Sequence, residues 1–511
     1  MISRFPLSVV LFYLILNLIS CNDDFDQTIL NYGNLSFSKD TVYLDSIFSN
    51  ISSSTRTLKV YNKSNNNITI PSIQLGRGEA SFYRLNVDGL DGKKFTNIDI
   101  LSKDSIYIFI EATIDFNHVT NPIYTDSIVF DSGEKLQDVD LVTLVQDAYF
   151  LFPSRDAQGI KEKIILGTDP EGDEIAIDGF YLDDNTVWKN DKPYVIYGYV
   201  GVPEGGSLTI EKGVNVHFHK SSGLLVDKNA SLKVKGEIGE EVIFEGDRLE
   251  PFYSDIAGQW GVIWLRAGSK DHSFKNAIIK NNTIGILMDS IGSLVQPTLK
   301  LYNTQIYNTS TFGILGRTAN IQGENVVIGN NGMSSLACTI GGTYNFIQST
   351  FANYWNSSIR QFPTLWVNNF LAFNNSDGTG SILTRDLIAA NFTNCIIDGN
   401  QNIEMILEQD MGAAFNYNFK NCMIKFDDVN GNYSDNPLFD FNDTSHYQEI
   451  ILNGEADFKN VENNELIIGQ ESEAIDQANR NAALQVPFDI LNINRISNPD
   501  IGAYQHIIFE D

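Results

Sequence analysis

Short apolar strands that each begin with asparagine recur through the second half of the chain. A strand of four residues cannot bury its own hydrophobic side, so such a repeat requires every copy to pack on its neighbours. From Asn276 the next copies start 27 and then 22 residues further on, and the last two start 27 residues apart. The pattern predicts a solenoid of parallel strands in which equivalent asparagines bond to one another at a spacing of about 4.8 Å. The copies are Asn276–Ile279, Asn303–Ile306, Asn325–Ile328, Asn394–Ile397 and Asn421–Ile424.

The same period is already present upstream of these copies. Leu208 and Leu232 lie 24 residues apart in equivalent strands, and Val214 and Val242 lie 28 residues apart. We therefore expect the solenoid to occupy residues 201–511, with residues 148–200 as a linking segment and cap.

Two motifs carry a family resemblance. Gly258–Trp264 and Asp500–Tyr504 are similar to segments of the right-handed parallel β-helix (pectate-lyase-like) repeat proteins that Bacteroidota export. The resemblance implies a right-handed parallel β-helix with a C-terminal cap. The segment from Ala474 to Tyr504 resembles the piece that often seals the last exposed edge of such helices.

Residues 35–147 have a different pattern, with short alternating strands separated by turn residues. Seven strands at this spacing are typical of a β-sandwich with one face of each strand buried. The strand end Val60–Asn62 and the strand entry Asp104–Ile106 resemble immunoglobulin-like modules of exported bacterial proteins, which implies a spacer or docking unit. The predicted fold class is therefore all-β, with an Ig-like β-sandwich followed by a right-handed parallel β-helix.

The first 20 residues resemble a bacterial lipoprotein signal peptide. A single basic residue, Arg4, precedes an apolar run that is too short to span a bilayer, and Leu18–Ser20 stand directly before Cys21. The resemblance implies that Cys21 carries a lipid and that this lipid anchors the protein to the membrane. It also implies that residues 21–34 form an acidic tether. It places the protein at the outer membrane, exposed on the cell surface.

Acidic residues dominate the composition. The chain has 64 Asp plus Glu against 35 Lys plus Arg, a formal charge of −29, which makes nucleic acid a very poor partner. An anionic glycan would be repelled unless a cation or a local basic cleft intervened. Neutral polysaccharides and surface proteins remain possible partners.

Cysteine and histidine residues give no metal or redox motif. With Cys21 lipidated, an odd number of cysteines remains, and Cys395 and Cys422 share one frame a coil apart, which favours stacked buried thiols. His217 and His219 could share a strand face, but the alternation of Val216 and Phe218 sends both imidazoles outward to solvent, and no third ligand is identifiable.

A run of acids and amides copies the first half of a calcium loop. Asp428, Asn430 and Asn432 have the correct spacing, but Tyr433 stands where the loop needs glycine and Phe439 where it needs glutamate. We interpret the run as a turn between coils. No cofactor or metal is expected, and calcium enters only if the protein is a lyase.

Large aromatic residues are candidates for stacking on sugar rings. Trp260 and Trp264 would share one face if their strand ran unbroken, and Tyr354, Trp355 and Trp366 are further candidates. Big aromatics also fill β-helix interiors, so core packing is the alternative for each.

The triplet Asp-Ser-Ile resembles an O-glycosylation sequon of Bacteroidota. Its acceptors would be Ser46, Ser105, Ser127 and Ser290, and Thr41 lies in a related triplet. The alternative is that Asp and Ser end a turn and Ile begins a strand.

Two classes of function remain. The first is a non-catalytic surface protein that binds glycan or another surface protein along an elongated flank. The alternative is a polysaccharide lyase or a glycoside hydrolase acting on a uronic-acid polymer. A lyase would need carboxylates and a positioned basic residue, for which 247–250, Arg266 and Lys270 supply the residue types. No aspartate pair suited to an inverting glycosidase lies within the recognisable strands.

Overall fold

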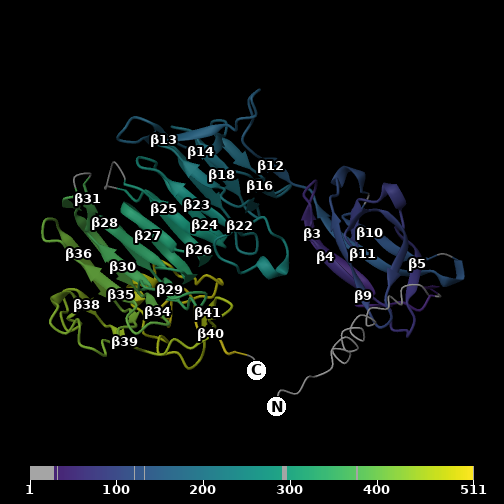
Figure 1. The fold of residues 1–511 in the computed structure, drawn as a ribbon. Helices are drawn as coiled ribbons and strands as arrows, with labels where there is room; N and C mark the ends of the chain where they lie inside the picture. Colours follow the sequence, from purple (N-terminus) through teal and green to yellow (C-terminus); the bar gives the residue numbers. More distant parts are fainter. Residues whose placement is uncertain are drawn as a thin grey trace, which may run out of the picture. The chain divides into compact units, whose positions relative to one another are not determined.

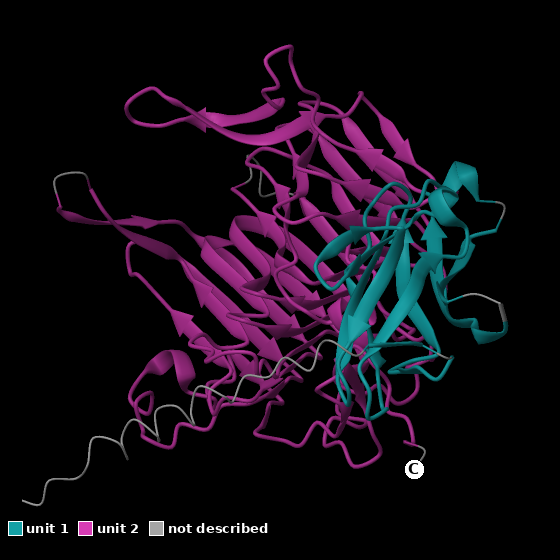
Figure 2. Cartoon of the chain, turned by 45° about the vertical axis from the view of Figure 1, so that its right-hand side comes forward, with its two compact units in different colours: residues 1–147 teal, residues 148–511 magenta. Residues whose placement is uncertain are grey.

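The computed structural model describes residues 28–509 except 32, 120, 132, 291–295 and 376–377. The predicted signal peptide and Cys21 lie outside the described residues. The chain divides into two compact units, residues 1–147 and residues 148–511 (Figures 1 and 2). Within the described residues, no helix is both long enough and apolar enough to cross a membrane.

Unit 1 is a sandwich of two sheets around one hydrophobic core. The first sheet has the order β1-β5-β10-β11-β3, with β8 paired to β5, and the second has the order β2-β4-β9-β6-β7. The first contains β1 (Ile29–Leu30), β3 (Thr41–Phe48), β5 (Ile68–Leu75), β8 (Lys94–Ile100), β10 (Ile123–Phe130) and β11 (Gln137–Gln146). The second contains β2 (Ser36–Phe37), β4 (Arg56–Tyr61), β6 (Tyr83–Val87), β7 (Leu90–Gly92) and β9 (Ser105–Ala112).

Unit 2 is a β-helix whose coils follow three parallel faces, here named A, B and C. Face A contains β14 (Glu174–Tyr181), β17 (Tyr199–Val202), β20 (Gly223–Val226), β23 (Trp260–Leu265), β25 (Asn282–Met288), β27 (Phe312–Asn331), β28 (Leu336–Ile347), β30 (Leu365–Asn368) and β35 (Met405–Glu408). Face B contains β15 (Thr186–Trp188), β18 (Ser207–Glu211), β21 (Ser231–Lys235), β24 (His272–Lys280), β26 (Leu299–Thr309), parts of β27 and β28, β33 (Leu387–Thr393), β36 (Phe415–Lys420) and β38 (Tyr447–Gln448).

Face C contains β12 (Tyr149–Leu151), β16 (Tyr194–Ile196), β19 (Asn215–Phe218), β22 (Val242–Gly246), the later parts of β24, β26 and β27, β29 (Thr350–Asn353), β34 (Ile396–Gly399), β37 (Met423–Ile424) and β39 (Ile451–Leu452). Outside the three faces lie the hairpins β13 (Lys163–Thr168) with β14, β31 (Phe370–Asn374) with β32 (Gly380–Thr384), and β40 (Phe458–Asn460) with β41 (Glu465–Ile468). The described residues of unit 2 also form the short helix α2 (Arg480–Ala483) and the 3-10 turns η5 (Pro251–Tyr253) and η6 (Pro437–Phe439).

Aligned rows of side chains fill the interior of the β-helix. On face B the rings of Phe346, Phe392, Phe419 and Tyr447 stack one coil above another, with successive centroids 5.7, 5.1 and 5.6 Å apart and nearly parallel planes. In-register parallel strands bring identical side-chain positions to the spacing at which aromatic rings attract one another. The all-β fold class predicted from the repeat is confirmed.

The repeated asparagines occupy the corner between faces B and C. Asn276, Asn303, Asn325, Asn394 and Asn421 all have left-handed backbones, with φ between 44° and 55°. Asparagine tolerates this conformation better than other residues with a side chain. The Asn303 amide donates to the Asn276 oxygen at 3.0 Å, and the Asn325 amide donates to the Asn303 oxygen at 2.8 Å, so the predicted ladder is present there.

The β-helix begins earlier than predicted. Strand β12 pairs in parallel with β16, and β14 pairs in parallel with β17, so coils are already stacking within the segment interpreted as a linker, before residue 201. The β13–β14 hairpin and the Asn and Asp residues of this segment mask its period in the sequence.

The C-terminal segment covers a flank of the β-helix and does not seal its end. Gln348 donates to the carbonyl oxygens of Asp500 and Gly502, and Asn421, two coils away, donates to that of Gln477. Residues 456–504 contribute Leu466, Ile490, Ile501 and Tyr504 to two small clusters on the outer side of face C. The covered outer row of face C includes Val327, Ile396 and Met423.

Candidate functional site

Trp260 is a core residue. Its side chain is 1% exposed, and its ring stacks on that of Phe218 with centroids 4.2 Å apart and planes 13° apart. The indole nitrogen donates to the Lys280 carbonyl oxygen at 2.9 Å. The prediction that Trp260 stacks on a glycan is therefore wrong, because a ring buried in this way cannot reach a ligand.

Trp264 lies on the opposite side of the same strand. A register shift between Val262 and Ile263 breaks the alternation, so Ile263 and Leu265 point inward and Trp264 points out. Its indole nitrogen donates to the Asp289 carboxylate at 2.6 Å, and the Arg266 guanidinium lies 5.8 Å from the ring centroid. Trp264 remains a candidate for stacking on a sugar.

The outer surface of face A is bordered by two projecting hairpins. Figure 2 shows the β13–β14 hairpin and the β31–β32 hairpin extending from unit 2 toward the same side. Between them the outward row of face A carries, on successive coils, Trp264, Leu287, Leu315, Ala337, Trp366 and Ile406. The Trp366 indole nitrogen donates to the Glu408 carboxylate at 2.7 Å.

Two adjoining hollows beside the β13–β14 hairpin form what we name the hairpin groove. Their volumes are about 580 and 440 Å³, and Asp178, Lys220 and Ser221 line both. Strands and turns of several coils contribute further lining residues, among them Phe152, Tyr197, Tyr199, His219, Gly261 and Thr283. The groove is elongated, because its lining extends from the first coil to the β25 strand.

The Tyr199 side chain packs directly over two glycines in this groove. A Cβ added at Gly223 or Gly261 would come within 2.6 Å of the Tyr199 ring or hydroxyl, so only glycine leaves room for the phenol at these positions. Burial raises the pKa of the Tyr199 phenol. Among the described residues, neither the Tyr199 hydroxyl nor the Lys220 ammonium has a hydrogen-bond or ion-pair partner, so both are available to a ligand.

His219 forms an ordered pair at one end of the groove. Its Nδ1 lies 2.7 Å from Asp247 Oδ2, and its ring stacks on Tyr197 with centroids 4.6 Å apart. Burial and the nearby Asp247 raise the pKa of Tyr197 to about 12. Tyr197 therefore stays neutral at physiological pH, and it lines the groove.

His217 contradicts the prediction that both imidazoles face solvent. It points away from the coil interior, but it is 5% exposed, and its Nδ1 lies 3.2 Å from the Gly246 carbonyl oxygen. Burial lowers its pKa. Alternation on a strand gives the direction of a side chain, whereas its burial depends on what the neighbouring coils place over it.

A second buried histidine, His272, gives the β-helix a pH dependence. Its Nδ1 accepts from the Leu232 backbone N–H at 3.2 Å, and its Nε2 lies 2.9 Å from the Ser269 hydroxyl. Burial, together with the Lys233 charge, lowers its pKa from 6.5 to about 3, against the opposing effect of Asp271. The folded state therefore binds fewer protons than the unfolded state between these values, and its stability falls as pH drops below about 6.5.

We expect the His272→Asn variant to be less sensitive to acid than the wild type. The asparagine oxygen can still accept the Leu232 N–H, but it does not titrate. The loss of unfolding free energy between pH 7 and pH 5, measured by urea denaturation, should be about 2 kcal/mol smaller in the variant. Equal losses in the two proteins would contradict a buried neutral imidazole at this position.

Both arginines that could have formed a lyase site are engaged elsewhere. Arg248 binds Glu250 at 2.9 Å and lies over the Tyr253 ring, and Arg266 binds Asp227 at 2.6 Å. Within the described part of the chain, no group of three or more His, Cys, Asp or Glu side chains could hold a metal ion. Asp428 instead accepts hydrogen bonds from the backbone N–H groups of Asn432 and Tyr433, four and five residues further on, and so closes a turn.

The cysteines that the structure describes are free and buried. Cys338, Cys395 and Cys422 all lie in the core, and the last two occupy equivalent positions on neighbouring coils. Burial raises the pKa of the Cys338 and Cys395 thiols well above the ordinary value, so the thiolate form needed for nucleophilic chemistry is disfavoured.

The serines of the Asp-Ser-Ile triplets lie in different settings. Ser46 and Ser127 lie within strands β3 and β10, Ser105 begins β9, and Ser290 is exposed after β25. The turn interpretation therefore fits Ser105 and does not fit Ser46 or Ser127. Glycosylation at all four remains a prediction.

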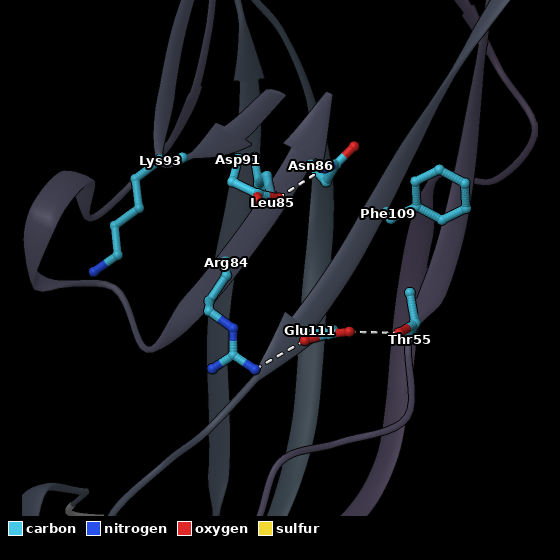
Figure 3. Close-up of a pocket in the computed structure, with 9 residues that line it drawn as sticks. Thr55, Arg84, Leu85, Asn86, Asp91, Lys93, Phe109 and Glu111 are labelled. Carbon is cyan, nitrogen blue, oxygen red and sulfur yellow. Dashed lines mark hydrogen bonds and ion pairs between the residues drawn. The ribbon is translucent and has the colours of Figure 1, made fainter. Parts of the chain in front are cut away.

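Unit 1 has a hollow of its own on the outer face of its second sheet, with a volume of about 710 Å³ (Figure 3). Arg84 binds Glu111 at 2.8 Å, and Asn86 donates to Asp91 at 2.7 Å, so its charged groups are largely paired with one another. Phe109 at its edge is 42% exposed and stacks on Tyr107. The hollow is charge-balanced, with an aromatic edge.

Sequence reasoning missed Tyr197, Tyr199 and Lys220. For Tyr199 the signal was the repeated glycine at the start of neighbouring coils, Gly223 and Gly261, which leaves space above the sheet for a ring from an adjacent coil.

Neither a protein-family model nor a curated protein matches the chain. Solved structures similar to it include a family 123 glycoside hydrolase from Clostridium perfringens that hydrolyses glycolipid glycans, with 10% identity and a TM-score of 0.17 over 22% of this chain and 26% of that one. They also include the catalytic domain of a GH87 α-1,3-glucanase in complex with tetrasaccharides, with 11% identity and a TM-score of 0.17 over 72% of this chain and 81% of that one. At this TM-score neither likeness carries a functional argument. The strand pairing itself defines the chain as an all-β protein whose second unit is a parallel β-helix.

Proposed function

We propose that this chain is a lipid-anchored cell-surface protein that binds carbohydrate in the hairpin groove without catalysing a reaction. The observation that carries the proposal is the Tyr199 ring, held over Gly223 and Gly261 with its hydroxyl unpartnered among the described residues. A flat aromatic surface beside free hydrogen-bonding groups matches a sugar ring, which has an apolar face and a rim of hydroxyls. The length of the groove suits a polymer.

Anchoring rests on the N-terminal sequence. Cys21 follows a short apolar run and a small residue, the arrangement of a lipoprotein signal in exported Bacteroidota proteins. The proposal predicts that a labelled fatty acid is incorporated into the wild type and not into Cys21→Ala, and that only the wild type fractionates with the outer membrane. Protease accessibility on intact cells tests exposure at the surface.

Binding is favoured over lyase chemistry by the charges that line the groove. Asp178 is the one carboxylate among the groove residues described, and Lys161 binds it at 3.0 Å. A lyase needs several carboxylates to bind calcium against the substrate's acid groups, close to an arginine or lysine that removes a proton. Incubation with uronic-acid polymers and calcium, followed by ultraviolet absorbance, tests the lyase directly, and an unsaturated product would overturn the non-catalytic assignment.

Tyr199→Ala should weaken carbohydrate binding by about 30-fold, because it removes the stacking surface and a hydroxyl at a cost of about 2 kcal/mol. A panel of neutral and acidic polysaccharides, screened by affinity electrophoresis with the mature chain, identifies the ligand, and calorimetry then gives the affinities of the variants. Tyr199→Phe keeps the ring and should lose much less.

The matched control is Tyr43→Ala, which removes a phenol that is 63% exposed on unit 1. Unchanged affinity in Tyr199→Ala, in a protein with wild-type thermal stability, would exclude the groove as the binding site. The screen has one further outcome. If no polysaccharide binds and cell attachment still depends on the chain, the partner is a surface protein.

A further inference from the structure

Lysines gather on one part of a strongly acidic protein. The chain has a formal charge of −29, yet six lysines lie on consecutive coils of unit 2, on face B and on the corner that leads into it from face A. They are Lys228, Lys233, Lys235, Lys270, Lys275 and Lys300.

The strand register brings several of these charges close together. Lys235 is the direct register partner of Lys275 on the next coil, and Lys233 and Lys300 share an outward row with Ser273 between them. Like charges opposite one another on neighbouring strands are destabilising, so the pairing of Lys235 with Lys275 is unfavourable by itself, whereas Glu211 faces Lys235 from the preceding coil. A bound anion would offset the repulsion.

Only one of the six lysines forms an ion pair among the described residues. Lys233 binds Asp271 at 2.7 Å, whereas the nearest polar contact of Lys270 is the Asn229 amide oxygen at 3.4 Å. Asn229 is in turn 3.4 Å from Glu204, so the nearby carboxylate contacts an amide and not an ammonium.

Three of these lysines surround one hollow, which we name the lysine hollow. Its volume is about 590 Å³, and it is lined by Lys228–Asn229 before β21, Gly268–Asp271 before β24 and Gln296–Thr298 before β26. Lys228, Lys270 and Lys300 line it from three successive coils, and Asn229, Ser269 and Thr298 add polar groups. Asp271, the carboxylate in its lining, is already bound to Lys233.

We propose that the lysine hollow binds the sulfate esters of a polysaccharide. Lysine ammoniums act as point charges that can approach a tetrahedral oxyanion from several directions, and three of them around one hollow match a group with three terminal oxygens. Lys235 and Lys275 continue the positive surface along face B. The site therefore suits a polysaccharide that carries several sulfate esters better than it suits a single ion. The site is independent of the hairpin groove.

The acidity of the whole chain does not prevent such binding. At physiological ionic strength charges are screened beyond about 8 Å, so an anion at the hollow responds mainly to the nearest lysines. Binding should therefore weaken as salt is added, because the ammonium contacts themselves are screened. Neutral polysaccharides should not bind at the hollow at any salt concentration.

The test measures binding of a fluorescent heparin hexasaccharide to the mature full-length chain by fluorescence anisotropy. The measurement is made at low salt, roughly 50 mM NaCl, and at high salt, roughly 300 mM NaCl. The triple variant Lys228→Gln, Lys270→Gln and Lys300→Gln should bind at least about 30-fold more weakly, because three charge-assisted contacts are lost. The control triple, Lys189→Gln, Lys420→Gln and Lys459→Gln, has the same change in net charge away from the hollow and should stay within about twofold of the wild type.

Saturable binding that salt weakens and that only the hollow triple variant loses supports the proposal. Equal loss in both triple variants, or no saturable binding in low salt, overturns it. Polygalacturonate binding as tightly as the sulfated probe would overturn the assignment to sulfate, and binding only to anionic lipid vesicles would overturn the assignment to a polysaccharide. Tyr199→Ala should not change heparin binding, which separates this site from the proposed groove.

Discussion

Arg360→Ala should lower the free energy of unfolding of unit 2 by about 3–5 kcal/mol, the cost of leaving one partner of a buried ion pair alone. Arg360 lies in the long loop between β29 and β30, and its Nη2 is 2.5 Å from Glu404 Oε1. Glu404 is 0% exposed and Arg360 is 6% exposed. Urea denaturation followed by tryptophan fluorescence measures the loss.

The expected cost is large because Glu404 would keep its burial and lose its counter-charge. Its carboxylate also accepts from the Thr364 hydroxyl and from the backbone N–H groups of Thr364 and Gln401, so it cannot move out to water without breaking three further bonds. Burial raises the pKa of Glu404 even with Arg360 present. In the variant the carboxyl should take up a proton more readily, so the deficit relative to wild type should shrink as pH falls.

Two further variants make the Arg360 result interpretable. Arg385→Ala removes an exposed guanidinium from the same unit and should cost less than about 0.5 kcal/mol. Adding Glu404→Gln to Arg360→Ala should recover part of the loss, because an amide is less costly to bury than a carboxylate. If the single and double variants were equally unstable, the ion pair would not be the source of the effect.

The repeat made much of the β-helix predictable. Asn303 and Asn325 could be placed at a corner from the sequence because a left-handed backbone and a side-chain ladder both favour asparagine at one position of every coil. In unit 1 the spacing predicted seven strands and the described residues form eleven, since strands such as β6 and β8 contain Asn or Asp, which read as turn residues. The hairpins were missed because they interrupt the period.

The candidate site was less predictable, for two physical reasons. A register shift inside β23 separated Trp260 from Trp264, and no pattern in seven residues shows where a strand will bulge. The hairpin groove draws residues from Phe152 to Thr283, so its existence depends on how successive coils align. Single residues such as Tyr199 therefore carry no signal until the register is known.

The strands of face C that are buried on both sides can be recognised in the sequence. Val326, Val327 and Ile328 form an unbroken apolar run, as do Ile396 and Ile397 after Cys395. A strand with one face in water alternates, whereas a strand covered on both faces does not. The runs therefore indicated a covering layer outside the coil, which the C-terminal segment provides.

Arg495→Ala should detach this covering layer and cost about 3 kcal/mol of unfolding free energy. Arg495 is 0% exposed, and its guanidinium donates to the carbonyl oxygens of Gly502 and Ala503 and to the Asn325 side chain, at 3.0–3.1 Å. Three acceptors would lose a charged donor at once, and each such bond contributes about 1.5–3 kcal/mol in isolation, with part recovered by water entering the site.

Detachment should be visible separately from global unfolding. In hydrogen exchange, the amides of residues 489–505 should exchange faster in Arg495→Ala, while those of the inner strands on face B keep their wild-type protection. Burial lowers the pKa of Arg495 to about 10, so the guanidinium stays charged at neutral pH and the wild type should show no such opening there. The control Arg480→Ala removes an exposed guanidinium from α2 in the same segment and should leave exchange unchanged. Uniformly faster exchange over all three faces in Arg495→Ala would instead show that the segment and the β-helix unfold as one cooperative unit.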